Sequence, residues 1–146
     1  MQSDDALAER LMKRRANALF VLSLVFVVTQ GSFIGGRSAP GVLHISAWVV
    51  MAVVLLAFFA TGGGWTRSKA VRALMNDEST RIHRARATTV AFYNMMASGV
   101  VIYGLGMIKP VSGGEAAHLI MTVGIASALM AFWGLERAAL RTSDAR

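Results

Sequence analysis

Four apolar stretches, each about twenty residues long, constrain this chain more than any other feature of its sequence. They span residues 16–35, 42–61, 87–108 and 116–135, and none of them contains Asp, Glu, Lys or Arg. An α-helix rises about 1.5 Å per residue, so about 20 residues cross the roughly 30 Å hydrocarbon core of a bilayer. The sequence therefore predicts an all-α fold, an integral membrane bundle of four helices.

The composition allows one domain and excludes cysteine chemistry. The chain has 146 residues, of which 55% are hydrophobic and 16% are charged. A soluble domain of this size usually carries more charge, about 25% of its residues. Because the spans and their short connections use up the chain, we expect a single transmembrane domain over residues 1–146. The absence of cysteine excludes disulfides, thiolate metal ligands and cysteine nucleophiles.

The basic residues indicate how the predicted bundle is oriented. Only Arg37 and Lys109 lie in the two short connections on one side, whereas the other thirteen of the 15 basic residues lie on the opposite side. Short loops rich in Lys and Arg stay in the cytoplasm. We therefore predict a multi-pass protein of the bacterial inner membrane with both termini and the central segment 62–86 in the cytoplasm. Because the basic residues lie next to the spans, we expect the net charge of +7 to serve contacts with the membrane rather than direct binding of nucleic acid.

Residues 3–15 have the pattern of a short amphipathic helix ahead of the first span. This helix offers basic side chains to lipid phosphates, and a partner protein is the alternative ligand. The basic residues concerned are Arg10, Lys13, Arg14 and Arg15. The span that follows has a long apolar core without a clear small-residue cleavage site, so we expect a retained signal anchor.

Small residues recur at helical spacing within the spans and predict close helix packing. Gly124, Ala128 and Phe132 share one stripe of the fourth span, with Ser127 and Ala131 beside it. Small side chains let backbones approach closely, which matters because lipid supplies no hydrophobic force between helices. The stripes favour a compact antiparallel bundle, and a homodimer face is the alternative. A basic segment precedes both the first and the third span, so the two hairpins are candidates for an internal duplication.

Two histidines and two amides are the candidate chemical groups within the spans. His44 and His118 lie near the outer ends of the second and fourth spans, where two neutral imidazoles can ligate a haem or a metal ion. The alternative is that both are interfacial side chains, and we expect no bound metal or cofactor. Gln30 and Asn94 are expected to bridge helices through their amides, with a small-molecule pocket as the alternative. His83, among the arginines of the central segment, is expected to be exposed to solvent.

The sequence lacks the motifs of the common enzyme classes. It has no nucleophile elbow, no metalloprotease motif and no pair of catalytic carboxylates. The run Gly62-Gly63-Gly64 lacks the Lys and the Ser or Thr that complete a phosphate-binding loop. We therefore expect a protein that is not an enzyme.

The segment from Asn76 to Ala87 is the most distinctive stretch of the chain. Asp77 can cap a helix that begins at Glu78 and continues into the third span. The segment resembles that of small uncharacterised prokaryotic four-span inner-membrane proteins, in which an Asn-Asp-Glu-x-Thr-Arg run leads into a transmembrane helix. Ser79 stands here where a basic residue is usual. The resemblance implies a companion of a small helix-turn-helix regulator, which such a protein holds at the membrane.

The leading functional hypothesis is a non-enzymatic interaction or regulatory subunit. An acidic helix start followed by basic residues is a charge pattern that a partner protein can recognise. The residues concerned are Asp77, Glu78, Arg81, Arg84 and Arg86. The alternative for this segment is a helix cap followed by arginines that bind lipid headgroups. Two other functions stay open: a small transporter or channel subunit that acts as a homo-oligomer, and a haem- or quinone-associated redox protein built around His44 and His118.

Overall fold

The computed structural model describes residues 13–14, 17–30, 41–61 and 78–143. Most of the predicted N-terminal helix 3–15 and the first part of the central segment lie outside these residues. The described residues form four helices, and all of their regular secondary structure is helical, which confirms the predicted all-α fold. The helices are Asn17–Gln30, α2 (Val42–Thr61), α4 (Glu78–Gly106) and α5 (Gly113–Ser143).

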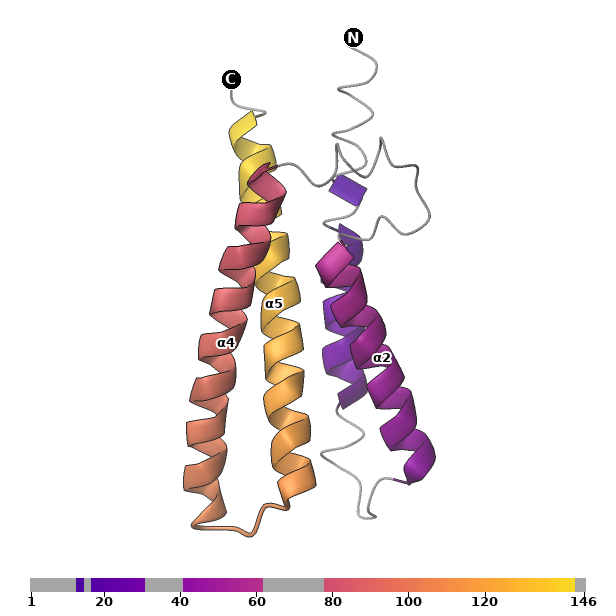
Figure 1. Cartoon of the computed structure of the whole chain (residues 1–146), viewed down its shortest axis with the longest axis vertical. Helices are drawn as coiled ribbons and strands as arrows, with labels where there is room; N and C mark the ends of the chain where they lie inside the picture. Colours follow the sequence, from indigo (N-terminus) through magenta and orange to yellow (C-terminus); the bar gives the residue numbers. More distant parts are fainter. Residues whose placement is uncertain (1–12, 15–16, 31–40, 62–77, 144–146) are drawn as a thin grey trace.

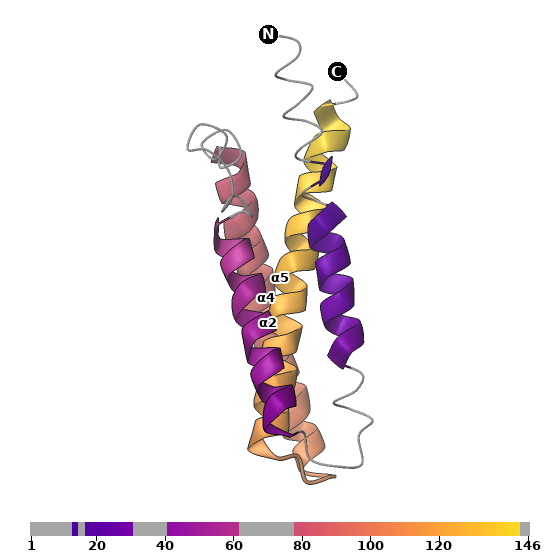
Figure 2. The same ribbon diagram turned by 90° about the vertical axis from the view of Figure 1, so that its right-hand side faces the viewer.

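Successive helices run in opposite directions along the long axis of the molecule (Figure 1). Residues 78–86 of α4 and 136–143 of α5 therefore lie at the same end, which we call the charged end. The connection of residues 107–112 lies at the opposite end, which we call the turn end. The view turned by 90° shows the Asn17–Gln30 helix and α2 on opposite sides of α5 (Figure 2).

Three of the described helices are long and apolar enough to cross a membrane: α2, α4 and the Gly113–Arg141 part of α5. Much of their apolar surface points outward, since Val42 is 84% exposed and Val100 is 71% exposed. Water penalises a large exposed apolar surface, whereas the hydrocarbon of a bilayer does not. These helices indicate a membrane protein. Of the predicted span 16–35, the structure describes the shorter apolar helix Asn17–Gln30.

The helices differ in how closely they follow the predicted spans. α2 covers the second predicted span residue for residue. α4 (Glu78–Gly106) ends two residues before the end of the third predicted span, and Asp77, the predicted cap, lies outside the described residues. α5 exceeds the predicted span 116–135 at both ends. Most of the additional helical residues lie at the charged end, so α4 and α5 both continue there beyond their apolar parts.

A hydrogen-bonded capping box begins α5. The backbone N–H of Glu115 donates to Ser112 Oγ at 3.2 Å, and the backbone N–H of Ser112 donates to Glu115 Oε2 at 2.9 Å. The Ser-x-x-Glu spacing lets two side chains satisfy N–H groups that have no partner within the helix. Pro110, two residues earlier, has no backbone N–H and cannot continue α4, so α4 and α5 are joined by a short turn.

The apolar core lies where the Asn17–Gln30 helix, α2 and α5 meet. Its most deeply buried side chains are Leu19, Phe26, Leu129 and Phe132, each at most 2% exposed. Phe59 of α2 packs edge-on against Phe132 of α5 with ring centroids 5.7 Å apart. Aromatic pairs in this geometry add to the stabilisation that burial of their area provides. The core therefore joins helices that are far apart in the sequence.

α4 packs closely against α5 at Gly124 and Ser127 of the predicted small-residue stripe. Gly124 is buried opposite Met95 of α4, and a Cβ atom at position 124 would lie 2.6 Å from Met95 Cγ. Asn94 Nδ2 donates a hydrogen bond to Ser127 Oγ across the same interface at 3.0 Å. Close packing through small residues is thus confirmed for this helix pair. The homodimer face and the duplication of the hairpins stay predictions.

We expect Gly124→Ala to destabilise the protein by about 1–3 kcal/mol, the usual effect of overpacking. The reason is that the new methyl group would have to displace Met95. Gly99→Ala is the matched control in α4, because its Cβ would make an ordinary contact at 3.7 Å from Ile120 Cδ1. Unfolding in detergent measures both variants. Equal stability of the two would contradict the close approach, and Met95→Ala is expected to recover part of the loss in the Gly124→Ala protein.

Candidate functional site

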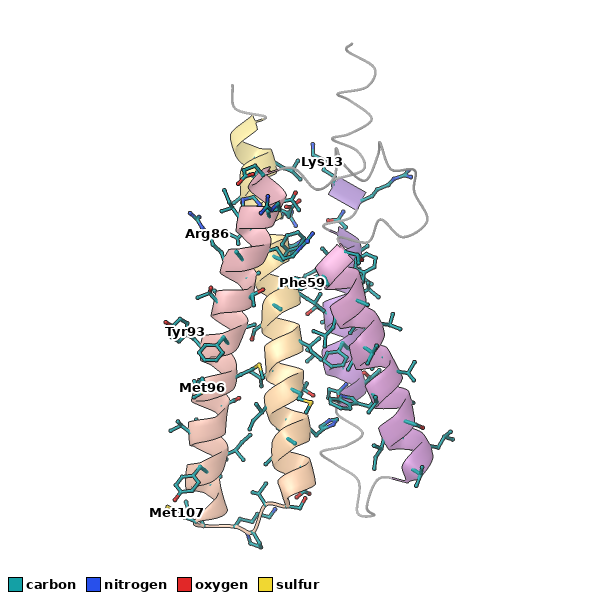
Figure 3. The ribbon with its side chains drawn as sticks, viewed as in Figure 1. Lys13, Phe59, Arg86, Tyr93, Met96 and Met107 are labelled. Atoms are coloured by element: carbon teal, nitrogen blue, oxygen red, sulfur yellow. The ribbon has the colours of Figure 1, made fainter. Side chains whose placement is uncertain are left out.

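The charged end carries the side chains that are expected to contact a partner. Glu78 and Arg81 lie one turn apart on α4, with 3.8 Å between Glu78 Oε2 and Arg81 Nη1. Their side chains are 80% and 71% exposed, respectively, and so exposed an ion pair contributes little to stability. Arg86 is exposed as well and projects from α4 on the side away from α5 (Figure 3). These three charged groups are accessible at the surface.

Arg84 makes a different contact from its basic neighbours. Its Nη1 donates a hydrogen bond to the carbonyl oxygen of Ala60, in the last turn of α2, at 2.7 Å. The last carbonyl groups of a helix have no partner within it and carry the negative end of its dipole. Arg84 is half-buried as a result, and it ties α4 to the end of α2. Its guanidinium group is therefore directed to the protein itself.

His83, which is partly buried, pairs with the buried Glu136 between α4 and α5. His83 Nδ1 lies 3.2 Å from Glu136 Oε1, and the two side chains are 16% and 6% exposed. A carboxylate that is removed from water needs a hydrogen-bonding or charged partner. Arg84 lies close enough to add an attractive electrostatic interaction with Glu136. The pair therefore joins the two helices where their apolar parts end.

These contacts hold the first turns of α4 on two sides. Arg84 fixes them to α2, and His83 fixes them to α5. Residues 78–86 are also part of the same continuous helix as the apolar part of α4. Side chains on a rigid helix are presented more precisely than side chains on a loop. We call this segment, residues 78–86, the anchored extension.

One residue of the anchored extension, His83, lies in different surroundings from those that the sequence predicts. The prediction that His83 is exposed to solvent is wrong, because the contact with Glu136 and the packing of α4 against α5 leave its side chain only 16% exposed. The sequence held one signal of this contact, since Glu136 is the acidic residue that directly follows the fourth apolar stretch. Lys13 and Arg14 of the predicted lipid-contacting set are exposed. The remaining members of the two predicted sets, Arg10, Arg15 and Asp77, lie outside the described residues.

His44 and His118 lie in different surroundings. His44 is exposed near the start of α2, whereas the ring of His118 packs against Trp48 of α2 with centroids 4.7 Å apart. In the part of the chain that the structure describes, no three His, Cys, Asp or Glu side chains gather as a metal site would require. Ligation of a haem or a metal ion by these two histidines stays a prediction.

The two amides within the helices behave differently. Asn94 bridges α4 and α5 through Ser127, as expected. Gln30 is 4% exposed, and its Nε2 donates to the carbonyl oxygen of Phe26 in its own helix at 2.8 Å. Its Oε1 has no hydrogen-bond partner among the described residues. The expectation that Gln30 bridges two helices directly is therefore wrong.

Comparisons with known proteins assign no family to the chain. It matches no protein-family model, and no curated protein and no solved structure is significantly similar to it. A function for this chain is therefore inferred from its own residues and from the contacts that they make.

The His83–Glu136 pair is expected to stabilise the contact between α4 and α5. Glu136→Ala leaves the partly buried His83 without its partner, which typically costs about 1–3 kcal/mol of stability. In a double-mutant cycle with His83→Ala, we expect the two losses to be non-additive by at least about 0.5 kcal/mol. Glu78→Ala is the control and should change stability by less than about 0.5 kcal/mol, because it removes an exposed ion pair. Additive losses in the cycle would contradict a direct interaction.

Proposed function

We propose that this chain is a four-span protein of the bacterial inner membrane, without enzymatic activity, whose cytoplasmic face binds a partner protein. The observation that carries the proposal is the anchored extension of α4. It exposes Glu78, Arg81 and Arg86 while His83 and Arg84 are held by the neighbouring helices. A partner of complementary charge can recognise such a pattern, since surface charges steer association and select among partners.

The charges of the described residues support the proposed orientation. Five arginines lie at the charged end, whereas Lys109 is the basic residue of the 107–112 connection. The arginines are Arg81, Arg84, Arg86, Arg137 and Arg141. Positively charged segments next to membrane helices stay on the cytoplasmic side. With the first span at residues 16–35, both termini and the anchored extension lie in the cytoplasm.

Topology reporters test this orientation. A fluorescent protein that folds only in the cytoplasm is expected to fluoresce when it is fused after Arg146. Alkaline phosphatase, which is active only in the periplasm, is expected to be active when it is fused after Lys109 and inactive when it is fused after Arg146. Phosphatase activity of the C-terminal fusion, or release of the native protein from membranes without detergent, would contradict the proposal.

The proposed partner is a soluble protein with an acidic surface. The likeness of residues 76–87 to the juxtamembrane segment of small four-span proteins supports a small helix-turn-helix regulator as this partner. In that arrangement the regulator reads the nucleic acid, and the membrane protein holds the regulator at the bilayer. Lys13 and Arg14, which are exposed, are the groups that we assign to lipid headgroups.

Co-purification from native membranes tests the role of the anchored extension. The double variant Arg81→Glu, Arg86→Glu is expected to recover at least about tenfold less of the partner, which corresponds to about 1.4 kcal/mol of binding free energy. Both side chains are exposed, so the variant should keep the unfolding midpoint of the wild type.

Arg141→Glu is the matched control, because Arg141 is also an exposed arginine but lies on α5. It is expected to retain the partner. Mass spectrometry identifies the co-purified protein, and its purified form then serves for binding measurements with each variant. Equal binding of the partner by the wild type and the double variant would contradict the proposal that the anchored extension binds the partner.

A further inference from the structure

Polar atoms of Gln30, Trp48 and Thr122 lie inside the bundle, away from the charged end. Gln30 Oε1, Trp48 Nε1 and Thr122 Oγ1 are shielded from solvent and have no hydrogen-bond partner among the described residues. The residues Gln30 and Thr122 are only 4% and 9% exposed. Buried polar atoms without a partner are rare in folded proteins, and an ordered water or a bound group often explains them.

The three residues lie on the core-facing sides of three different helices. Gln30, Trp48 and Thr122 follow or precede core residues at spacings of three or four, which place side chains on one helical face. The core residues on these faces are Leu19 and Phe26 in the first helix, Ala52 and Leu55 in α2, and Ile125 and Leu129 in α5. The three polar side chains therefore point toward the same core.

A contact between two aromatic rings allows the positions of Gln30 and Thr122 along the long axis of the bundle to be compared. Phe20 of the first helix packs against Trp133 of α5 with ring centroids 4.7 Å apart. Gln30 lies ten residues from Phe20 toward the turn end, and Thr122 lies eleven residues from Trp133 in the same direction. At about 1.5 Å per residue, these separations are about 15 and about 17 Å. Gln30 and Thr122 therefore lie at the same level of the bundle.

Trp48 reaches this level from α2. Its ring contacts His118, which lies one helical turn from Thr122 on the same face of α5. The contact between Phe59 and Phe132 gives the same register, because Trp48 precedes Phe59 by eleven residues and Thr122 precedes Phe132 by ten. Gln30, Trp48 and Thr122 thus lie within about one helical turn of each other along the bundle, at the edge of the apolar core that faces the turn end. We call these three residues the polar layer.

We propose that the polar layer binds one ordered water molecule, which links the first helix, α2 and α5. The indole N–H of Trp48 can only donate a hydrogen bond, the carbonyl oxygen of Gln30 can only accept one, and the hydroxyl group of Thr122 can do either. A metal cation cannot accept from the indole, and an anion without a proton cannot donate to the amide. Water does both, and these three groups provide the two to four partners that buried waters usually have.

This site goes beyond the proposed binding function, since it lies in the bundle core and uses none of the residues of the anchored extension. The water supplies the connection between helices that Gln30 does not make directly. Ser23 provides a contrast on the first helix. Its hydroxyl group is also buried without a partner among the described residues, but it lies two helical turns from Gln30, toward the charged end and away from the polar layer.

Nuclear magnetic resonance of the full chain in lipid nanodiscs tests the site directly. The protein has three tryptophans, so labelling with ¹⁵N-tryptophan gives three indole signals, and Trp48→Phe identifies that of Trp48. We expect a magnetisation-transfer cross-peak between the indole proton of Trp48 and water. A soluble gadolinium chelate should not broaden this signal, because the water is internal. Absence of the cross-peak, or strong broadening by the chelate, would overturn the proposal.

Paired variants separate a bound water from a structural effect. Thr122→Val and Gln30→Leu are expected to abolish the cross-peak, whereas Thr122→Ser, which keeps the hydroxyl group, should retain it. Ser23→Ala is the control for loss of an isolated buried hydroxyl group and should also retain it. An unchanged Trp133 indole signal shows that each variant is folded. A cross-peak that persists in both Thr122→Val and Gln30→Leu would refute the assignment of the water to these residues.

Discussion

The packing of other helices against α5 is the interaction on which the described structure depends. Phe20 of the first helix contacts Trp133, Phe59 of α2 contacts Phe132, and Met95 of α4 lies against Gly124. α5 is accordingly the most buried of the three membrane-length helices. In lipid, such packing must come from close fit and hydrogen bonds, because apolar side chains gain nothing by leaving hydrocarbon for each other. Small residues on α5 allow that fit.

The two ends of the bundle use polar groups in different ways. At the charged end, His83, Arg84 and Glu136 make direct contacts between helices and fix the anchored extension. Toward the turn end, Gln30, Trp48 and Thr122 have hydrogen-bonding atoms inside the core that find no direct partner among the described residues. Direct contacts between helices hold the anchored extension in a fixed position. The unpartnered atoms of the polar layer can instead form hydrogen bonds to a water molecule between the helices. The proposed partner site and the proposed water site follow from this difference.

Much of the architecture could be predicted because it depends on local sequence. The bounds of α2 follow from an uninterrupted apolar run without a charged residue. The contacts of His83 and Gln30 could not be predicted in this way. His83 meets Glu136, a residue 53 positions away, and the position of Glu136 directly after the fourth apolar stretch does not by itself say which residue of α4 faces it. Gln30 bonds to its own helix because no described side chain of a neighbouring helix reaches it.

The sequence by itself determined the helical class, the apolar segments and the concentration of positive charge, because hydrophobic periodicity and charge placement are properties of the chain. The tertiary structure alone decided which charged groups of the anchored extension are exposed and which are held by neighbouring helices. Arg81, Arg84 and Arg86 have the same kind of side chain, yet Arg84 alone of the three donates to the end of α2. The physical reason is that exposure depends on which helix packs against each face, and that is fixed only when distant segments meet.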